Sequence, residues 1–379
     1  MSDALQPADA REAAEMIAAS RRLEVRGGGS KAAYGAPQRD EATILDARRL
    51  CAVVDYDPQE FVLTAGAGAP LAEIEALLAA HGQRLAFEPP DLGPVLGAPA
   101  GRATLGGVLA ANLSGPRRIA AGAARDHLLG FEAVSGRGIA FKAGGRVVKN
   151  VTGFDLSKLM AGSWGALALL TTVTVRTGTV PRAAATLRLK GLSDDRAVEA
   201  MGAALGLPLE VSGACHLPLD GETVLRVEGI QPSVDFRIAR LAEALRSFGA
   251  PDILGTEATA GLWRRIGDLA PLAGRPGALW RISVPPAAGA EIAARLGEAP
   301  RMLDWAGGLV WTVLAEVCAA EVRALAERLG GHATLVRADA PAGVAAFHPE
   351  PPALAALAAR VRTAFDPQGV FVDRVRPRA

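Results

Sequence analysis

Cysteine and net charge are both scarce in this sequence, and each shortage excludes a class of protein. The three cysteines, Cys51, Cys215 and Cys318, lie far apart and form no C-x-x-C pair. They cannot hold an iron–sulfur cluster alone, and we expect neither a structural metal site nor a disulfide framework. Because 41 basic residues balance 40 acidic ones, no nucleic-acid partner is expected either.

Long hydrophobic runs are also absent. The most apolar stretch, Leu159 to Val175, is interrupted by Ser163, by threonines and by glycines, and it is too short to span a bilayer. The first residues, MSDALQPADAREAAEM, show neither the basic region nor the apolar core of a secretory signal. We therefore expect a cytoplasmic protein without a transmembrane segment.

Apolar residues make up 50% of the 379-residue chain, enough for two buried cores. Helix and strand patterns alternate up to Phe87, and this rhythm predicts a small parallel sheet covered by helices. A Gly/Pro/Ala-rich segment follows, and the β-branched runs after it predict antiparallel strands. The expected elements are helices at 9–20 and 70–82 and strands at 23–25, 52–56, 61–65, 84–87, 128–135, 138–143, 146–149 and 167–177.

A domain boundary is predicted near Val180-Pro181-Arg182, which divides the chain into units 1–182 and 183–379. Beyond it, the patterns follow the order β-α-β-β-α-β, in which helices cover one face of an antiparallel sheet. We expect one or two ferredoxin-like α+β halves. Their strands are predicted at 186–190, 208–214, 222–228, 279–284, 302–304, 309–314 and 333–337, and their helices at 193–205, 234–248, 288–297 and 319–329.

Three consecutive glycines stand in the stretch VRGGGSK, directly after the first strand. A diphosphate is best bound by several backbone N–H groups that point at one spot, and side chains would block that approach. Gly27, Gly28 and Gly29 leave the backbone open. Arg26 and Lys31 flank them and add positive charge. The alternative is a mobile turn, and this loop alone does not decide between the two.

A second glycine-rich loop, ATLGGVLAANLSGP, contains the pair Gly106-Gly107. Because a diphosphate has two faces, two such loops can close on it from both sides. The alternative is helix packing through small residues. A third segment, KNVTGFDLSKLMAGSWG, contains a turn and a short helix, and its residues alone do not assign it to a cofactor or to packing.

A rival phosphate site is FVLTAGAGAPL, which has the strand, G-x-G and helix order of a dinucleotide-binding fingerprint. Glu88, after the next strand, would be its ribose ligand. Leu71 occupies the third glycine position, however, and its side chain would hold helix and strand apart. We therefore favour the two-loop site over a Rossmann site.

Together, the three segments resemble flavoproteins of the vanillyl-alcohol-oxidase type, whose FAD-binding domain is also called PCMH-type. RGGGSK resembles their first pyrophosphate loop, ATLGGVLAANLSGPRR the second, and KNVTGFDLSKLMAGSWGALALLTTVTV a third conserved stretch. With WRISVPP and DWAGGLVW further on, the chain looks similar to the FAD-binding subunits of bacterial glycolate oxidases (glycolate dehydrogenases). The resemblance implies an α+β fold: a PCMH-type FAD-binding domain, with a small parallel α/β part and an antiparallel α+β part, and then the ferredoxin-like domain.

The resemblance also implies which residues bind FAD. Members that attach FAD covalently often carry a histidine in the first glycine loop, where this chain has Ser30-Lys31, so non-covalent FAD is expected. The residues carried over as cofactor-binding are Arg26, Gly27, Gly28, Gly29, Ser30, Lys31, Thr104, Leu105, Gly106, Gly107, Asn112, Ser114, Gly115, Gly162, Ser163 and Gly165.

The implied function is that of a flavoprotein oxidoreductase subunit, which oxidises glycolate to glyoxylate and passes the electrons on. Its partners would be a second FAD subunit and an iron–sulfur subunit, in a complex that is cytoplasmic or peripheral to the inner membrane. Two alternatives stay open. One is a self-sufficient FAD-dependent oxidase or dehydrogenase of another 2-hydroxy acid or alcohol, and the other is a non-catalytic assembly subunit that FAD only stabilises.

Two features depart from the relatives. Those that oxidise 2-hydroxy acids carry the metal motif H-x-G-D-G-N-x-H, whereas this chain has only GGHAT around His332. No metal is expected and no catalytic residue is assigned, since His216, His332 and His348 are isolated and are interpreted as packing or surface residues. Arg281 could hold a carboxylate, although a surface or interface position is the simpler interpretation. The C-terminal FDPQGVFVDRVRP lacks the asparagine of the family's N-P-G, and no cofactor contact is carried over there.

Overall fold

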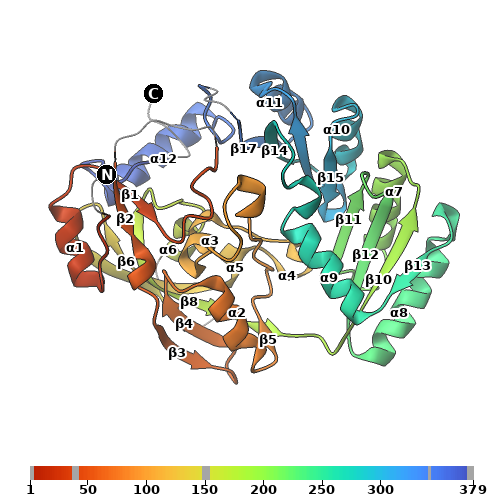
Figure 1. Ribbon diagram of the computed structural model, residues 1–379, viewed down its shortest axis with the longest axis horizontal. Coiled ribbons are helices and arrows are strands. Elements are labelled where there is room, and N and C mark those ends of the chain that lie inside the picture. The colour runs from red at the N-terminus through yellow and green to blue at the C-terminus, as the bar shows by residue number, and fades with distance from the viewer. Residues whose placement is uncertain (1–3, 36–41, 147–153, 340–342, 374–379) are drawn as a thin grey trace.

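A computed structural model describes residues 4–35, 42–146, 154–339 and 343–373 of the chain. Two α+β units lie side by side, an N-terminal one on the left of Figure 1 and a second one on the right. Each is built on its own sheet. The fold class predicted from the sequence is confirmed. No helix in the described ranges combines the length and the apolar character needed to cross a membrane.

The main sheet of the N-terminal unit is antiparallel. A parallel pair, β1 (Leu23–Arg26) with β2 (Thr43–Asp46), and a short antiparallel pair, β5 (Gln83–Arg84) with β9 (Gly178–Thr179), complete the strands of this unit. The five strands of the main sheet are, in spatial order, β3 (Val53–Asp57), β4 (Val62–Gly66), β8 (Ala168–Arg176), β6 (Leu128–Ser135) and β7 (Ala140–Gly144).

The helices of this unit begin where the sequence offers caps. The Asp9 side chain accepts from the N–H of Glu12 at the start of the first helix, and Thr104 accepts from Gly107 at the start of the third. The helices are α1 (Ala10–Ala18), α2 (Leu71–Ala79), α3 (Leu105–Ala111), α4 (Arg118–Ala121), α5 (Ala124–His127) and α6 (Leu156–Met160).

Among the named strands of the described residues, β1 and β2 form the one parallel pair, and isolated parallel bridges such as Leu5 with Leu45 add to it. The runs 52–56 and 61–65, expected in the parallel sheet, form β3 and β4 instead and pair antiparallel. The reason is that only residues 58–61 separate β3 from β4, and a connection this short joins antiparallel strands, whereas parallel neighbours need a crossover of a dozen or more residues. Strand β8 then pairs with the other edge of β4, also antiparallel. An apolar run marks a buried strand but does not encode the direction of its neighbour. Of the strand expected at 84–87, only Arg84 belongs to a strand, β5. Residues 147–149 of the strand expected at 146–149 lie outside the described residues.

The second unit contains two ferredoxin-like halves, as the repeated pattern predicted. Their strands join into one eight-stranded antiparallel sheet, in which the halves meet where His216 pairs with Leu303. In spatial order the strands are β13 (Asp252–Leu254), β10 (Ala183–Lys190), β12 (Glu222–Gly229), β11 (Gly213–Leu217), β15 (Arg301–Asp304), β16 (Leu309–Leu314), β14 (Ala278–Ser283) and β17 (His332–Arg337).

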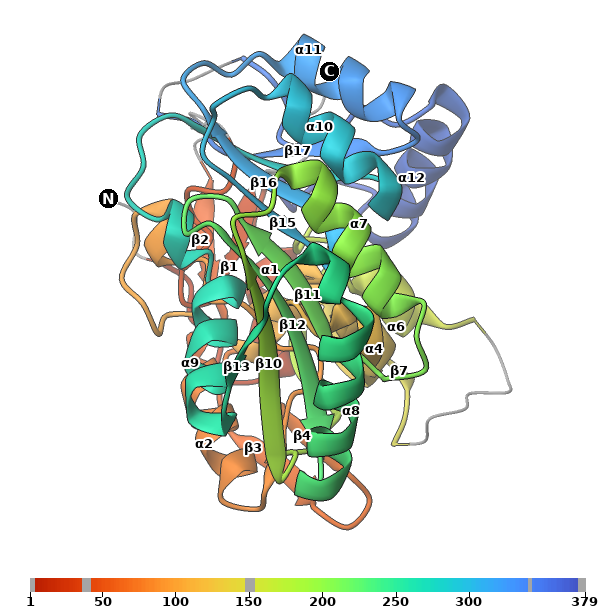
Figure 2. The same ribbon diagram turned by 90° about the vertical axis from the view of Figure 1, so that its right-hand side faces the viewer.

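Helices cover one face of this sheet, and the other face is turned toward the N-terminal unit. Figure 2 shows α7 (Asp194–Leu205), α8 (Gln231–Ala244) and α10 (Gly289–Arg295) in front of the strands. With α11 (Ala319–Arg328), they bury a core around Trp280. Strand β11 begins later than the predicted 208, because residues 206–212 form the turn after α7.

Five α-helices of the described residues were not expected from the sequence: α3, α4 and α5 in the Gly/Pro/Ala-rich segment, and α9 (Thr256–Gly267) and α12 (Pro352–Phe365) in the second half of the chain. Helix α12 carries the chain back to the N-terminal unit (Figure 1), where Phe371 bridges to Leu23 of β1. The end of the chain therefore packs on the first unit, and the division at residues 182 and 183 stays a prediction.

A buried group of charged side chains joins the two units. Arg226 of β12 donates to both carboxylate oxygens of Glu88, at 2.8 and 2.9 Å. Arg117 donates to Glu88 at 2.9 Å and to Glu228 at 2.6 Å. We call Glu88, Arg117, Arg226 and Glu228 the interunit charge cluster.

Candidate functional site

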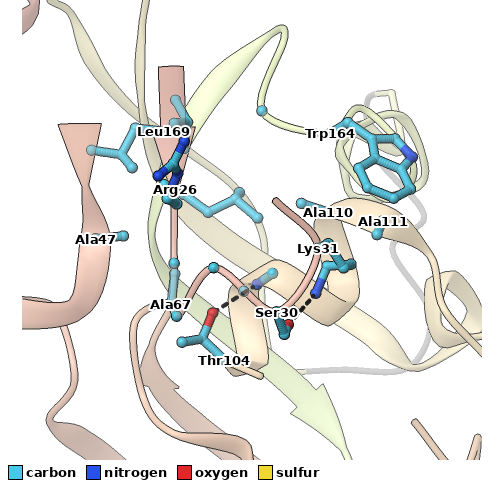
Figure 3. Close-up of a pocket in the computed structure, with 18 of the residues that line it drawn as sticks. Arg26, Ser30, Lys31, Ala47, Ala67, Thr104, Ala110, Ala111, Trp164 and Leu169 are labelled. Carbon is cyan, nitrogen blue, oxygen red and sulfur yellow. Dashed lines mark hydrogen bonds between the residues drawn. The ribbon is translucent and has the colours of Figure 1, made fainter. Parts of the chain in front are cut away.

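The first and second glycine loops lie against each other and line one cavity (Figure 3). The first loop follows β1. The segment predicted as the second loop is largely a helix, α3, with Gly106 and Gly107 in its first turn. A Cβ atom on residue 28 would lie 1.7 Å from the carbonyl oxygen of Arg102, and one on residue 27 would lie 2.3 Å from Oγ1 of Thr104. Only glycine permits this approach, so the sequence pattern is explained first by contact between the loops.

The glycines of GAGAP, the rival phosphate site, allow the backbone to pack closely against the segment around Ala47 and Leu50. A Cβ on Gly66 would lie 2.1 Å from the carbonyl oxygen of Leu50, and one on Gly68 would lie 1.9 Å from that of Ala47. Glu88, the ribose ligand of the rival site, is engaged in the interunit charge cluster. The arrangement therefore gives no support to a Rossmann site.

The two loops differ in what their backbone N–H groups do. Those of residues 27–31 have no acceptor among the described residues. In the second loop, by contrast, Leu105 donates to the carbonyl of Ala69 at 3.0 Å and Gly106 to that of Ala67 at 2.8 Å. The first loop thus lines the cavity with backbone N–H groups that are available to a ligand. The second segment forms a wall of the cavity, and its hydrogen bonds hold that wall in place.

Lys31 supplies a positive charge that the protein leaves uncompensated. Its ammonium lies 3.4 Å from Oγ of Ser30, a contact drawn in Figure 3, and forms no ion pair with the described residues. Burial lowers the pKa of Lys31 to about 8, against the opposing effect of Asp91. Arg26 is different, since Glu24 pairs with it at 2.6 Å. A buried, unpaired cation beside free N–H donors is an environment that an anion would stabilise.

Ten of the predicted residues line this first cavity, and its opposite wall is apolar, with Leu169 and Ala67 at its surface. Two others lie away from it. Leu105 is fully buried in the hydrophobic core, and Gly115 is packed against the backbone of Glu88. The predicted residues at the cavity are Arg26, Gly27, Gly28, Gly29, Ser30, Lys31, Thr104, Gly106, Gly107 and Gly165.

A second cavity, of about 930 Å³, adjoins the first one and is lined on one side by the eight-stranded sheet. Both cavities are lined by Tyr34 and Trp164, whose ring centroids lie 4.4 Å apart. The sequence analysis did not single out either aromatic residue. Trp164 has a positive φ of 54°, which is uncommon for a residue other than glycine, and nothing in the segment GSWG indicates it.

The remaining predicted residues lie around this second cavity. Asn112, Ser114 and Gly162 line it, and Ser163 lines a neighbouring groove beside α12. The Asn112 and Ser114 side chains accept from the backbone N–H groups of Arg125 and Ala124, at 3.0 and 2.9 Å. Their hydrogen bonds therefore support the start of α5. Lys149 to Gly153 of the third segment lie outside the described residues.

Positive and aromatic side chains meet in the second cavity. Arg118 and Arg281 both stack on Trp305, with the guanidinium carbon 4.7 and 5.3 Å from the ring centroid. Of the expected surface or interface position of Arg281, the surface position is wrong, because β14 directs this side chain into a cavity that residues of both units line. His332 and His348 also line it, whereas His216 is buried and bonded to Thr223 at 2.8 Å, as expected of a packing residue.

The geometry fits a dinucleotide with a diphosphate bridge. Free N–H donors, an uncompensated ammonium and glycines without room for a side chain lie at one end, and a larger aromatic cavity adjoins them. In the described part of the chain, no three His, Cys, Asp or Glu side chains converge as metal ligands would.

Comparisons with known proteins agree with this arrangement. Residues 4–144 match the model of an FAD binding domain. The chain is 36% identical to glycolate oxidase subunit GlcE of Escherichia coli (strain K12), over 92% of this chain and 91% of that protein. A D-lactate dehydrogenase of Archaeoglobus fulgidus is 34% identical, but over only 40% of this chain and 32% of that protein.

The fold has counterparts among solved structures. Alkyldihydroxyacetonephosphate synthase superposes with a TM-score of 0.70 and 15% identity, over 96% of this chain and 75% of that one. This likeness concerns the fold alone. The sequence identity to GlcE extends over nearly the whole length of both chains and therefore shows the family. The chain belongs to the family of glycolate oxidase subunit GlcE, whose members are FAD-binding oxidoreductase subunits.

Proposed function

We propose that this chain is the FAD-binding subunit of a multi-subunit glycolate oxidase, in which glycolate is oxidised to glyoxylate. Its relation to GlcE over 92% of the chain supports this role. The observation that carries the proposal is that the two cavities adjoin at Tyr34 and Trp164, since one suits a diphosphate and the other is lined by two arginines. A dinucleotide cofactor and an acidic substrate would meet where Tyr34 and Trp164 stand.

In this proposal, the N–H groups of residues 27–31 and the ammonium of Lys31 bind the diphosphate of FAD. The bound flavin supplies a two-electron acceptor. Thr104 and Gly107 close the same wall, and Gly165 lies on the other side of the cavity. Among the described residues that line this first cavity there is neither histidine nor cysteine, so we propose that FAD is held without a covalent bond.

The electrons would leave through partner subunits. The three cysteines remain separate, with Cys51 and Cys318 exposed and Cys215 buried, and so provide no cluster site of their own. We therefore propose a complex with a second FAD subunit and an iron–sulfur subunit, cytoplasmic or peripheral to the inner membrane. The FAD-binding unit would comprise residues 1–182 and the second unit, which covers the flavin, residues 183–379.

Anaerobic spectroscopy tests this function. The full chain is purified alone and with its partners, its flavin bands are recorded, and glycolate is added. Bleaching of the flavin in the complex supports the proposal, and bleaching in the isolated chain would favour a self-sufficient enzyme. Flavin bands that respond to glycolate in neither preparation would favour an assembly subunit, and a chain without flavin would contradict FAD binding.

A further inference from the structure

We propose that Arg118, Arg281 and His332 form a metal-free site for a small 2-hydroxy carboxylate in the second cavity. The two arginines would bind the carboxylate, and His332 would accept the hydroxyl proton. This inference rests on the proposed function, since it needs FAD in the adjoining cavity. It goes further by assigning the chemistry to this chain rather than to a partner.

The register of the sheet brings these groups onto one surface. On β14, Arg281 lies opposite Thr334 of β17, and Ser283 lies opposite His332. Side chains alternate between the two faces of a strand, so all four point the same way. All of them line the second cavity. Trp280 and Ile282, the neighbours of Arg281 along β14, point to the other face, into the core beneath the helices.

Arg118 comes from the opposite wall of the cavity. It is the first residue of α4 in the N-terminal unit, and Trp305 connects it to the sheet. The Trp305 ring stacks with both guanidinium groups, and its indole N–H donates to the carbonyl of Gly115 at 3.2 Å. Two cationic groups from separate units are thus fixed around one aromatic ring.

Both arginines are half-buried, and their side chains lack the partners that other enclosed arginines have. Arg226 is paired with carboxylates, and Arg337 donates to the carbonyl of Val95 at 2.7 Å. The guanidinium groups of Arg118 and Arg281 form no hydrogen bond or ion pair with any described residue. Burial lowers the pKa of Arg281 against the opposing effects of Tyr34 and Asp304, and Arg118 lowers it further, yet a guanidinium stays charged in proteins. A carboxylate between the two would satisfy donors that are otherwise unused.

The two histidines of the cavity differ in availability. His348 is occupied on both ring nitrogens, because Nδ1 accepts from the N–H of Ala333 at 3.2 Å and Nε2 lies 2.8 Å from Oε1 of Glu327. His332 has no hydrogen-bond partner among the described residues. Burial lowers its pKa, and Arg281, His348 and Arg118 lower it further. Its imidazole is therefore neutral near pH 7 and free to accept a proton.

The proposed step balances without a metal. The O–H bond of the substrate breaks and its proton goes to an unprotonated ring nitrogen of His332. FAD bound in the adjoining cavity would supply the two-electron acceptor for the hydrogen of the C–H bond at the same carbon and its electron pair, and the carbon–oxygen bond would become double. The acid would thereby be oxidised by two electrons to a 2-oxo acid, with its carboxylate still bound to the arginines.

Oxalate, which resembles the substrate but cannot be oxidised here, tests the arginines. Its binding to the full chain, alone or with partners, is measured by equilibrium dialysis and by the shift of the flavin spectrum. We expect saturable binding in the native protein, at least tenfold weaker binding in Arg281→Met and Arg118→Met, and partial recovery in Arg281→Lys. Arg240→Met is the control, since Arg240 is exposed on α8 and pairs only with Glu243.

His332→Asn tests the proton acceptor. We expect oxalate affinity within threefold of the native value, but reduction of the flavin by glycolate slowed about 100-fold or more. In the native protein, the reduction rate should rise with pH through the lowered pKa of His332 and level off by pH 7, and the variant should lack this rise. Glu327 and Glu350 line this cavity, and Asp304, whose pKa burial raises to about 7, acts on Arg281. All three are unchanged in the variant and cannot produce the difference between it and the native protein.

The outcomes separate this inference from the proposed function. A native protein that holds no FAD overturns both. A protein that holds FAD, but binds oxalate equally in Arg281→Met and Arg240→Met, overturns the carboxylate site and leaves the FAD-binding role intact. Native reduction kinetics in His332→Asn overturn the role of that histidine.

Discussion

Gly28 and Arg102 approach so closely that a Cβ on residue 28 would lie 1.7 Å from the carbonyl oxygen of Arg102. The contact is between backbones, so no side-chain rotation can relieve it. It fixes the spacing of the two loops, and hence the width of the cavity that we assign to the diphosphate of FAD.

Replacement of Gly28 by alanine should therefore separate the loops. We expect Gly28→Ala to lose most of its FAD and to unfold with a free energy lower by about 1–3 kcal/mol, the range for an overpacked site. The ratio of flavin to protein absorbance after gel filtration and a denaturant titration measure the two effects. Gly202→Ala, in α7 with nothing within 4 Å of the added methyl group, is the matched control and should keep its FAD.

Loss of the ammonium of Lys31 should weaken FAD binding. A charged hydrogen bond is worth about 1.5–3 kcal/mol, so Lys31→Met should bind FAD roughly 10- to 100-fold more weakly at pH 7. Lys190→Met, on an exposed side chain paired with Asp252, should bind FAD as the native chain does. Fluorescence titration of the FAD-free proteins gives the affinities.

The same lysine should make FAD binding depend on pH. Since burial lowers the pKa of Lys31 to about 8 in the FAD-free protein, the ammonium is present below that value and is lost as the pH rises through it. The diphosphate binds the ammonium form, so affinity should fall between about pH 7 and 9. Lys31→Met should show no such fall, and an equal fall in the variant would assign it to another group.

Dissociable FAD is expected from the lining of the first cavity. Precipitation of the native protein with acid should release the yellow cofactor into the supernatant. Recovery of one FAD per chain there, by absorbance and chromatography, would agree with non-covalent binding. Yellow colour that stays with the precipitate would show a covalent bond.

The interunit charge cluster should matter for stability. Removing the charge of Glu228 leaves the buried Arg117 and Arg226 with the single carboxylate of Glu88 between them, so Glu228→Gln should lower the free energy of unfolding by about 3–5 kcal/mol at pH 7. Burial would raise the pKa of Glu228, but Arg226 and Arg117 outweigh it and lower the pKa to about 2. The stabilisation is therefore complete above the ordinary value of 4.5 and lost as the pH falls through about 2.

Urea titrations at pH 7 and at pH 2.5 measure this difference. The gap between the native protein and Glu228→Gln should narrow at the lower pH. Glu243→Gln removes an exposed charge that pairs with Arg240, and it should change stability by less than about 1 kcal/mol at either pH. An effect of Glu228→Gln no larger than this control would contradict the role of the cluster.

Much of the fold could be predicted from periodicity and caps. Ser193 begins α7 as expected, and both ferredoxin-like halves follow the order of strands and helices in the sequence. Strand direction could not be predicted in the same way. β4 lies between β3 and β8, and the position of β8 depends on contacts with a segment far along the chain.

The site could be predicted only where sterics restrict the residue type. Consecutive glycines indicate close backbone contact, and the two loops do meet. Arg118 and Arg281 were harder to identify, because an arginine is common on surfaces and only the register of β14 turns one of them inward. The histidines posed the same problem, since only tertiary contacts show which one, His332 or His348, has free ring nitrogens.

The interunit charge cluster has a further consequence for how substrates are chosen. Separation of the two units would break the ion pair between Arg226 and Glu88. A hinge motion between the units is therefore energetically unfavourable. The second cavity should therefore keep a fixed size and shape. We expect small acids to enter and leave by the side near Pro351 and Leu354, the latter half exposed at 50%, and longer acids to be rejected by shape.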